Sequence, residues 1–423
     1  MTRLVVIGGN AAGMSAASKA KRRAPDLEVV VYEAGPDIST SVCGVPYLVE
    51  GILPDPEQLL VLTPEKAAER GIEIHTGTQV LGFNAFTKEV VLQTPQGRDS
   101  THYDKLLIAS GTAARYPFKG PRLAGVHTIR HLEDGLRVAA TAPRAKKVAV
   151  VGGGYVGLEM AAAYKARGAE VNLLTRGKRL LSAMDADITD GLTEWLENAG
   201  IKVHLEATVK GFASGKKEGE LGSVEGKKDV PADTALVAVG VEAATEFAVK
   251  GGVMSTKEGF ILVDDNMRTN YHDIWAAGDC VAARHIVTGR PTPMPFALPS
   301  NRMGRVAGDA IGASTEKIPG SSMYFPGVLG TAITHLFGLA FAQTGITEAI
   351  AKQEGIDAVA ALIESKDKAS YMPGAADMAV KVVREVLRRN PHLPPERIGD
   401  VVFAATAQVG DQGLTMGRDV ALL

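Results

Sequence analysis

The sequence lacks several features that would point directly to a function. Its two cysteines, Cys43 and Cys280, are too few for a disulfide framework and fit a reducing cytoplasm. Lys and Arg total 46 against 48 Asp and Glu, and this near-neutral balance without a long basic run argues against a nucleic-acid-binding protein. No apolar run is long enough to span a membrane, and the strand-like run that begins at Arg3 leaves no room for a signal peptide. The nine histidines show no metal-ligand spacing, so we expect no metal site. The few cysteines and the lack of a signal peptide predict a cytoplasmic protein.

The 423-residue chain is instead rich in glycine, and much of it falls in two similar segments. Residues 3–17 read RLVVIGGNAAGMSAA, and residues 147–161 read KVAVVGGGYVGLEMA. Each segment is a β-branched run, a glycine cluster and a small-residue stretch typical of a helix, and each continues to another apolar run, at 28–32 and at 170–174. Strands that alternate with helices in this way predict an α/β fold with parallel sheets.

The first glycine cluster has the composition of a turn that binds a pyrophosphate. Gly8 permits a tight turn, Gly13 lets the following helix pack on its strand, and the small residues between them let backbone N–H groups approach a phosphate. Glu33 follows at a strand end, where a carboxylate can bind a ribose hydroxyl. Asn10 stands where the GxGxxG pattern has its middle glycine, so a tight turn without a ligand remains the alternative.

The second cluster, residues 152–157, satisfies the GxGxxG pattern in full. Its second strand ends in Arg176, with Lys178 and Arg179 close behind and no acidic residue. A carboxylate would repel the 2′-phosphate of NADP, whereas a guanidinium pairs with it, and so the sequence favours NADPH, with NADH as a possible second donor. The alternative is a solvated basic loop.

Cys43 lies in the segment 39–47, STSVCGVPY, shortly after the strand that Glu33 ends. A helix is expected to start near this cysteine, because Pro46 is tolerated in a first helical turn. Unpaired N–H groups and the helix dipole would then lower the pKa of the thiol and favour a reactive thiolate. The alternative is a small buried thiol that fills space.

Several motifs in order, GGNAAGMSAA, SxxxCGxPY, GGGYVGLE, AAGD and SYMPGA, resemble those of the FAD-dependent pyridine nucleotide–disulfide oxidoreductases. The resemblance covers residues 1 to about 382 and is to the single-cysteine branch, which includes coenzyme A disulfide reductases, NAD(P)H oxidases and persulfide reductases. Two-cysteine members carry CxxxxC, whereas Leu48 stands at the second of these positions here. The resemblance implies an α/β fold with two Rossmann-like dinucleotide-binding domains and a smaller α+β dimerisation domain, hence a homodimer.

The domain boundaries follow from the order of these motifs. We expect a discontinuous FAD-binding domain at 1–115 and 247–320, an NAD(P)H-binding domain at 116–246 and a partial dimerisation domain at 321–383. The polar stretch 214–229 is expected to be a solvated, hairpin-like loop, and Val383 to Arg389 a basic amphipathic helix. Residues 384–423 replace the family's usual continuation and resemble a fragment from near the N-terminus of a thiolase, without that enzyme's catalytic cysteine.

The resemblance also implies a role for individual residues. The expected FAD-binding residues are Gly8, Ala11, Ala12, Gly13, Glu33, Ala109, Gly111 and Asp279. The expected nucleotide-binding residues are Gly152, Gly154, Gly157, Arg176 and Lys178, with Tyr155 as a gate over the flavin and Glu159 near the nicotinamide. Arg22, Ser39, Asn301 and Arg302 match substrate-binding positions. Tyr371 resembles a tyrosine that one subunit supplies to the other, where it protonates a leaving thiolate. For Asn301, Arg302 and Tyr371 the alternative is ordinary core or surface polarity.

The sequence thus predicts an oxidoreductase that passes hydride from NADPH through FAD to Cys43 and reduces coenzyme A disulfide or a related small disulfide or persulfide. An NAD(P)H oxidase that reduces O₂, with Cys43 cycling through a sulfenic acid, is the alternative among enzymes. A nucleotide-binding redox sensor or scaffold without turnover is the alternative outside them.

Overall fold

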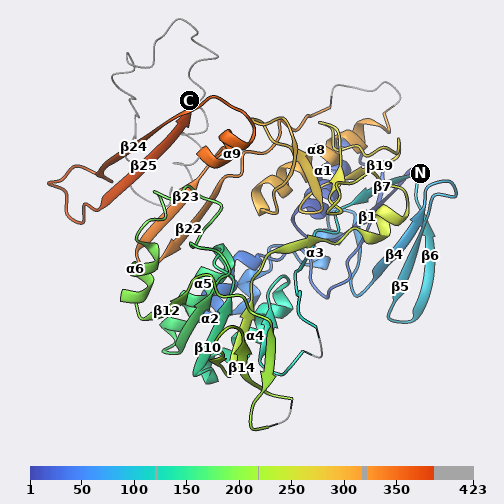
Figure 1. Cartoon of the computed structure of the whole chain (residues 1–423). Helices are drawn as coiled ribbons and strands as arrows, with labels where there is room; N and C mark the ends of the chain where they lie inside the picture. Colours follow the sequence, from blue (N-terminus) through green and yellow to red (C-terminus); the bar gives the residue numbers. More distant parts are fainter. Residues whose placement is uncertain (120–121, 218, 317–321, 385–423) are drawn as a thin grey trace, which may run out of the picture.

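The computed structural model describes residues 1–119, 122–217, 219–316 and 322–384. Both predicted βαβ units are present, and each forms the centre of a five-stranded parallel sheet (Figure 1). The first sheet has the order β19-β7-β1-β2-β3. Its strands are β1 (Arg3–Ile7), β2 (Glu28–Tyr32), β3 (Ile72–His75), β7 (Lys105–Ile108) and β19 (Ile274–Ala276). The central strands are almost wholly buried, which explains their continuous runs of Val, Leu and Ile.

The second sheet repeats this arrangement in the order β12-β11-β10-β16-β9. Its strands are β9 (Val126–Thr128), β10 (Lys147–Val151), β11 (Glu170–Leu174), β12 (Ile201–His204) and β16 (Thr234–Val237). The register also repeats, because Arg3 pairs with Glu28 in the first sheet and Lys147 with Glu170 in the second. The α/β fold with two Rossmann-like units is therefore confirmed, whereas the domain boundaries remain predictions.

Helices cover the sheets, and the closest helix pair lies on the first one. In helix α1 (Ala11–Arg23) the backbone carbonyls of Ala12 and Ala16 face helix α8 (Ala297–Ala313). A Cβ on Gly304 or on Gly308 would lie only 2.2 Å from one of these carbonyl oxygens, so the helices can approach this closely only through glycine. The other α-helices are α2 (Val45–Glu50), α3 (Pro64–Ala68), α4 (Leu132–Thr141), α5 (Tyr155–Ala166), α6 (Leu192–Asn198), α7 (Glu246–Lys250) and α9 (Glu348–Gln353). Short 3₁₀ helices are η1 (Val42–Gly44), η2 (Pro56–Leu59) and η3 (Ala142–Arg144).

Antiparallel pieces complete the two units. They are β4 (Gln79–Asn84) with β5 (Glu89–Thr94) and β6 (Gly97–His102); β13 (Gly211–Ser214) with β14 (Leu221–Glu225) and β15 (Val230–Pro231); and β8 (Thr112–Ala114) with β17 (Val241–Ala243). A mixed sheet joins them, in which β20 (Val281–Arg284) pairs in parallel with β18 (Ile261–Leu262) and antiparallel with β21 (Pro291–Pro293). The stretch 214–229 takes part in a hairpin, as predicted, because β14 pairs with β13, but the prediction of a solvated loop is wrong at β14. Leu221 and Val224 of β14 are buried, and this apolar contact outweighs the polar composition around them.

The C-terminal part of the described chain consists of two hairpins and one short helix. Strand β22 (Ala332–Leu336) pairs with β23 (Leu339–Gln343), and β24 (Val359–Lys366) pairs with β25 (Asp377–Arg384). The helix predicted from Val383 is wrong at its start, because Val383 and Arg384 end β25. The sequence DMAVKVVR is rich in valine, a residue common in strands, and it pairs with β24 along its length. The rest of that helix and the thiolase-like tail lie outside the described residues.

None of the helices in the described part of the chain combines the length and the apolar character needed to cross a bilayer.

Candidate active site

The first glycine turn joins β1 to α1 and is shaped by backbone contacts. Gly8 has a positive φ of 100°, and a Cβ there would lie 2.3 Å from the carbonyl oxygen of Ala109, just after β7. A Cβ on Gly13 would lie 1.8 Å from the carbonyl oxygen of Gly8. The Ala109 N–H in turn donates to Ile7 O at 2.8 Å. Only glycine at both positions lets strand, turn and helix come together in this way.

Asn10 is the N-cap of α1, a role that its place in the motif did not reveal. Its Oδ1 accepts hydrogen bonds from the N–H groups of Ala11 at 3.0 Å and Thr40 at 3.1 Å, and its Nδ2 donates to Thr40 Oγ1 at 2.8 Å. The side chain therefore ties the start of α1 to the segment that leads to Cys43.

The carboxylate of Glu33 lies beside this turn, as the spacing suggested. Its Oε2 accepts the Gly9 N–H at 2.7 Å and its Oε1 accepts the Gly35 N–H at 2.9 Å. β2 runs next to β1, so the residue after β2 falls next to the turn after β1. The carboxylate is thus fixed at the place where a ribose hydroxyl would approach.

Asp279 follows β19 and has two partners that the sequence did not suggest. Its carboxylate accepts hydrogen bonds from Arg130 Nη2 at 2.6 Å and from Ser300 Oγ at 2.5 Å. Arg130 also donates to the carbonyl oxygen of Thr112 at 2.9 Å, close to Gly111. Ser300 directly precedes Asn301 and Arg302, which the sequence predicted to bind substrate, but Ser300 itself was not predicted. No local pattern marks Arg130.

The second glycine turn, between β10 and α5, repeats the geometry of the first. Gly152 has a φ of 124°, and a Cβ there would lie 2.1 Å from the carbonyl oxygen of Ala238. A Cβ on Gly157 would lie 2.0 Å from the carbonyl oxygen of Gly152. Gly154, the N-cap of α5, differs because a Cβ there would meet no atom within 4 Å and no side chain caps the helix. Open space in front of uncapped N–H groups suits a pyrophosphate.

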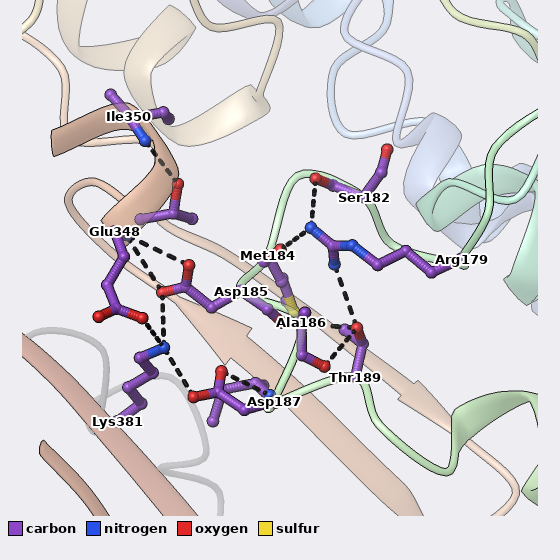
Figure 2. Close-up of polar contacts among 12 residues, drawn as sticks. Arg179, Ser182, Met184, Asp185, Ala186, Asp187, Thr189, Glu348, Ile350 and Lys381 are labelled. Carbon is purple, nitrogen blue, oxygen red and sulfur yellow. Dashed lines mark hydrogen bonds and ion pairs between the residues drawn. The ribbon is translucent and has the colours of Figure 1, made fainter. Parts of the chain in front are cut away.

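The basic residues after β11 have different surroundings. Arg176 and Lys178 are exposed beside the second turn. Arg179 instead donates hydrogen bonds within its own loop, to Met184 O at 2.6 Å and to Thr189 Oγ1 at 3.2 Å (Figure 2). Arg176 and Lys178 are therefore the cations available to a 2′-phosphate.

Cys43 lies in η1, at the start of the helical segment that α2 continues. Pro46 occupies the first turn of α2, as expected. The thiol is exposed, while Val45 and Val49 of α2 are buried in the same cluster as Leu158 of α5. This packing places the segment that carries Cys43, which follows the first βαβ unit, beside helix α5 of the second βαβ unit.

The prediction of a lowered thiol pKa is wrong for the chain as the structure describes it. Although Cys43 has an exposed surface, neighbouring protein atoms desolvate it partly, and this burial raises the pKa of the thiol. The carboxylates of Glu159 and Asp279 raise the pKa further, and the Arg130 guanidinium opposes them. These charges come from distant parts of the sequence and outweigh the short helix.

Glu159 and Tyr155 lie on one face of α5, close to Cys43. Burial raises the pKa of Glu159, and a hydrogen bond of 2.7 Å from Thr334 Oγ1 of β22 opposes this shift. The hydroxyl of Tyr155 is buried without a hydrogen-bond partner, and burial raises the pKa of Tyr155 to about 12. A buried hydroxyl without a partner fits a polar ligand placed between these groups. Thr334, which no motif marks, ties the β22–β23 hairpin to this site.

The expected substrate-binding residues do not all come together. Arg22, near the end of α1, lines a surface cavity of about 480 Å³ together with Ser18, Lys21, Pro25, Arg70 and Ile72. Ser39 and Asn301 lie closer to the first turn: the Ser39 N–H donates to Gly9 O at 2.9 Å, and Asn301 Oδ1 accepts from Ser15 Oγ at 2.6 Å. Arg302 is exposed on α8. Tyr371, 87% exposed, lies in the connection of the β24–β25 hairpin, which Figure 1 shows away from α2.

Comparison with known proteins agrees with this geometry. The family model for pyridine nucleotide-disulphide oxidoreductases matches residues 2–300, as far as the first turn of helix α8. The chain belongs to this family. The family is one of redox enzymes that use FAD and a pyridine nucleotide, so the predicted family, the enzymatic activity and both kinds of cofactor are confirmed.

Similar members of the family carry names that differ in substrate. The NAD(P)H coenzyme A polysulfide/persulfide reductase of Pyrococcus horikoshii is 36% identical, over 90% of this chain and 84% of the relative. The NADH oxidase of Methanocaldococcus jannaschii is 32% identical, over 90% and 84%. Among solved structures, the NAD-dependent persulfide reductase of A. fulgidus has a TM-score of 0.85 and 31% identity, over 90% of this chain and 71% of that one.

This oxidoreductase has residues that fit both cofactors. The open helix start at Gly154, the buried Tyr155 hydroxyl and the Glu33 carboxylate at the first turn are the groups that two dinucleotides require. Within the described residues no group of three or more His, Cys, Asp or Glu side chains is arranged so that it could hold a metal ion.

Proposed function

We propose that this oxidoreductase reduces a small disulfide, with electrons that pass from NADPH through FAD to Cys43. The preferred substrate is coenzyme A disulfide or a related disulfide or persulfide. The observation that supports this most is the exposed thiol of Cys43 at the start of the segment that packs against α5. A thiol in that place can meet a substrate from outside and a redox cofactor from inside.

The substrate class is supported by charge. Lys21, Arg22 and Arg70 line one cavity, and three cations in one cavity suit a phosphorylated molecule such as coenzyme A. Relatives named for coenzyme A polysulfide or persulfide are consistent with this. Ser39, Asn301 and Arg302 are proposed to contact the same substrate. In a homodimer, Tyr371 would protonate the leaving thiolate from the other subunit.

The chemistry divides between the thiol and its surroundings. The Cys43 thiolate attacks one sulfur of the disulfide, a new S–S bond forms, and one coenzyme A leaves as a thiolate that takes up a proton. FAD, when bound, supplies the relay for two electrons from the nicotinamide. Those two electrons break the mixed disulfide, which releases the second coenzyme A and restores Cys43. Glu159 and Asp279 raise the thiol pKa, whereas a backbone hydrogen bond at Cys43 and the Arg130 guanidinium lower it and favour the thiolate.

The nucleotide preference is proposed from Arg176 and Lys178, which are exposed beside the second turn. Glu33, in the corresponding place of the first unit, is a carboxylate bound to the turn. A nucleotide with a 2′-phosphate therefore finds cations only at the second turn.

The name of the Methanocaldococcus relative favours a second candidate, an NAD(P)H oxidase. In that case two electrons from the nicotinamide would reduce O₂ to H₂O₂, and the Cys43 thiolate would attack the H₂O₂, becoming a sulfenic acid as water leaves. Two electrons from a second NAD(P)H would then reduce the sulfenic acid back to the thiol and release a second water. The same exposed thiol would serve both reactions, so turnover has to separate them.

The test is to replace Cys43 with Ser and to measure NADPH oxidation with coenzyme A disulfide without oxygen, and with O₂ alone. The variant is expected to keep its flavin absorbance and to lose disulfide reduction by about 10³-fold or more, because a hydroxyl does not form the mixed disulfide. Cys280→Ser is the matched control, since Cys280 is fully buried and its Sγ donates weakly to Ala277 O and Ile108 O. Undiminished disulfide reduction by Cys43→Ser would refute the proposal, and turnover with O₂ alone by the wild type would favour the oxidase.

A further inference from the structure

Lys381 of β25 lies within a group of carboxylates that the proposed chemistry does not use (Figure 2). Its Nζ is 2.7 Å from Asp187 Oδ2 and 3.6 Å from Asp185 Oδ2, and it also contacts the carboxylate of Glu348. The Lys381 side chain is only 7% exposed. The acidic partners come from two places: Asp185 and Asp187 from the loop after Arg179, and Glu348 from the first turn of α9.

The charges make Lys381 the centre of this group. The ammonium donates hydrogen bonds to Asp187 and Glu348 and lies at ion-pair distance from Asp185, so the group carries one positive and three negative charges. Although burial opposes its charged form, hydrogen bonds to Asp187 and Glu348 raise the pKa of Lys381, and the ammonium lowers the pKa of Asp187 in return. Without the ammonium, the three carboxylates would repel one another and the loop would lose its ion pairs to β25, although the Glu348 N–H still donates to the Asp185 carboxylate at 3.2 Å.

The same loop is fixed to the second glycine turn. Met184 O and Ser182 O accept hydrogen bonds from Arg179 Nη2 at 2.6 and 3.1 Å. The Leu181 N–H donates to the carbonyl oxygen of Gly153 at 2.9 Å, and Leu181 holds a positive φ of 44°, which costs energy in a branched residue. A continuous set of hydrogen bonds therefore runs from Lys381 through this loop to the turn and to the segment that carries Arg176 and Lys178.

We infer that Lys381 is a positioning residue for the nicotinamide nucleotide, acting through loop 181–189 on the second glycine turn. This inference rests on the proposed function, since it takes that turn as the nucleotide site. It makes the β24–β25 hairpin, far along the sequence from the turn, part of the support of that site. Lys381 itself touches no ligand in this account.

The test replaces Lys381 with Met, which keeps the length of the side chain and removes its charge. NADP⁺ binding is measured by titration calorimetry, and the KM for NADPH and kcat by turnover. We expect binding about tenfold weaker and a KM about tenfold higher, with kcat within twofold and flavin retained. Lys381→Arg should restore binding to within about threefold, because a guanidinium keeps the charge and the donors. Arg176→Ala gives the loss expected when a direct contact to the 2′-phosphate is removed.

Lys366→Met is the matched control. Lys366 lies on the same hairpin, but it is 45% exposed and its ion pair, at 2.5 Å, is with Asp377 of that hairpin. If Lys366→Met weakened NADP⁺ binding as much as Lys381→Met does, a general loss of hairpin stability would explain both and the positioning role would be wrong. If the wild type bound NADP⁺ and a folded Lys381→Met bound it equally well, the inference would fail while the proposed function stood. A wild type that bound no nucleotide would overturn both.

Discussion

The two glycine turns have the same backbone and different surroundings. In both, a glycine Cβ would collide with the carbonyl oxygen of the turn's first glycine, at 1.8 Å for Gly13 and 2.0 Å for Gly157. The first turn is closed by side chains, since Asn10 caps the helix and Glu33 binds the turn. In the second turn, Gly154 takes the position of Asn10, and a Cβ there would meet no atom within 4 Å. The exposed Arg176 and Lys178 take the place of the Glu33 carboxylate.

This difference suggests how each turn treats its ligand. A side chain that caps α1 and ties it to the segment before Cys43 makes a rigid turn, which suits a ligand that stays bound. An uncapped helix start with exposed Arg and Lys lets a charged ligand enter and leave. We therefore interpret the first turn as the FAD site and the second as the site of the exchanging nucleotide.

The largest expected effect comes from an alanine at the last glycine of each turn. Gly13→Ala and Gly157→Ala each place a Cβ against a backbone oxygen that no side-chain movement relieves, so each should lower the free energy of unfolding by about 3 kcal/mol. A Gly→Ala change inside a helix normally stabilises a protein. A loss of stability here would therefore point to the contact with the backbone oxygen. Urea unfolding measures the loss.

The two variants should then differ in what they fail to bind. Gly13→Ala is expected to purify without flavin colour, whereas Gly157→Ala should keep its colour and lose NADPH binding. Loss of flavin from both to the same extent would show that the two turns are not separate sites.

A smaller and more selective effect is expected at Gly154. An alanine there meets no protein atom, and its φ of −91° is accessible to alanine, so the free energy of unfolding should fall by no more than about 1 kcal/mol. The methyl group would occupy the space in front of the α5 N–H groups and raise the KM for NADPH about tenfold or more. Steady-state kinetics with NADPH test this, and an unchanged KM would show that no phosphate approaches Gly154.

The framework of both turns could be predicted because its signals are local. Gly8, Gly13 and Glu33 are placed by one βαβ unit, and the repeat at 147–174 places the second in the same way. Local sequence gave a wrong prediction where a short stretch is compatible with both a helix and a strand. The stretch from Val383 was predicted as a helix, but its first residues belong to β25.

The surroundings of Cys43 could not be predicted from local patterns. The thiol pKa depends on Glu159, Asp279 and Arg130, which the fold brings near it from separate elements. Thr334 donates a hydrogen bond to Glu159 from the β22–β23 hairpin, whose largely apolar sequence gives no sign of this contact. Such contacts join single residues that are far apart in the sequence and belong to no motif. Only the folded structure therefore reveals them.

The smallest expected effect tests the cap of the first turn. Asn10→Ala removes the acceptor for the Ala11 and Thr40 N–H groups, and should lower the free energy of unfolding by about 1 kcal/mol in urea. Asn10→Asp keeps the acceptor and should recover most of that stability. Its added negative charge, however, lies at the turn where a pyrophosphate binds, and so it should weaken FAD binding more than Asn10→Ala does. If Asn10→Asp instead bound FAD as tightly as the wild type, the first turn would not be the pyrophosphate site, and the contrast between the two turns would lose its functional meaning.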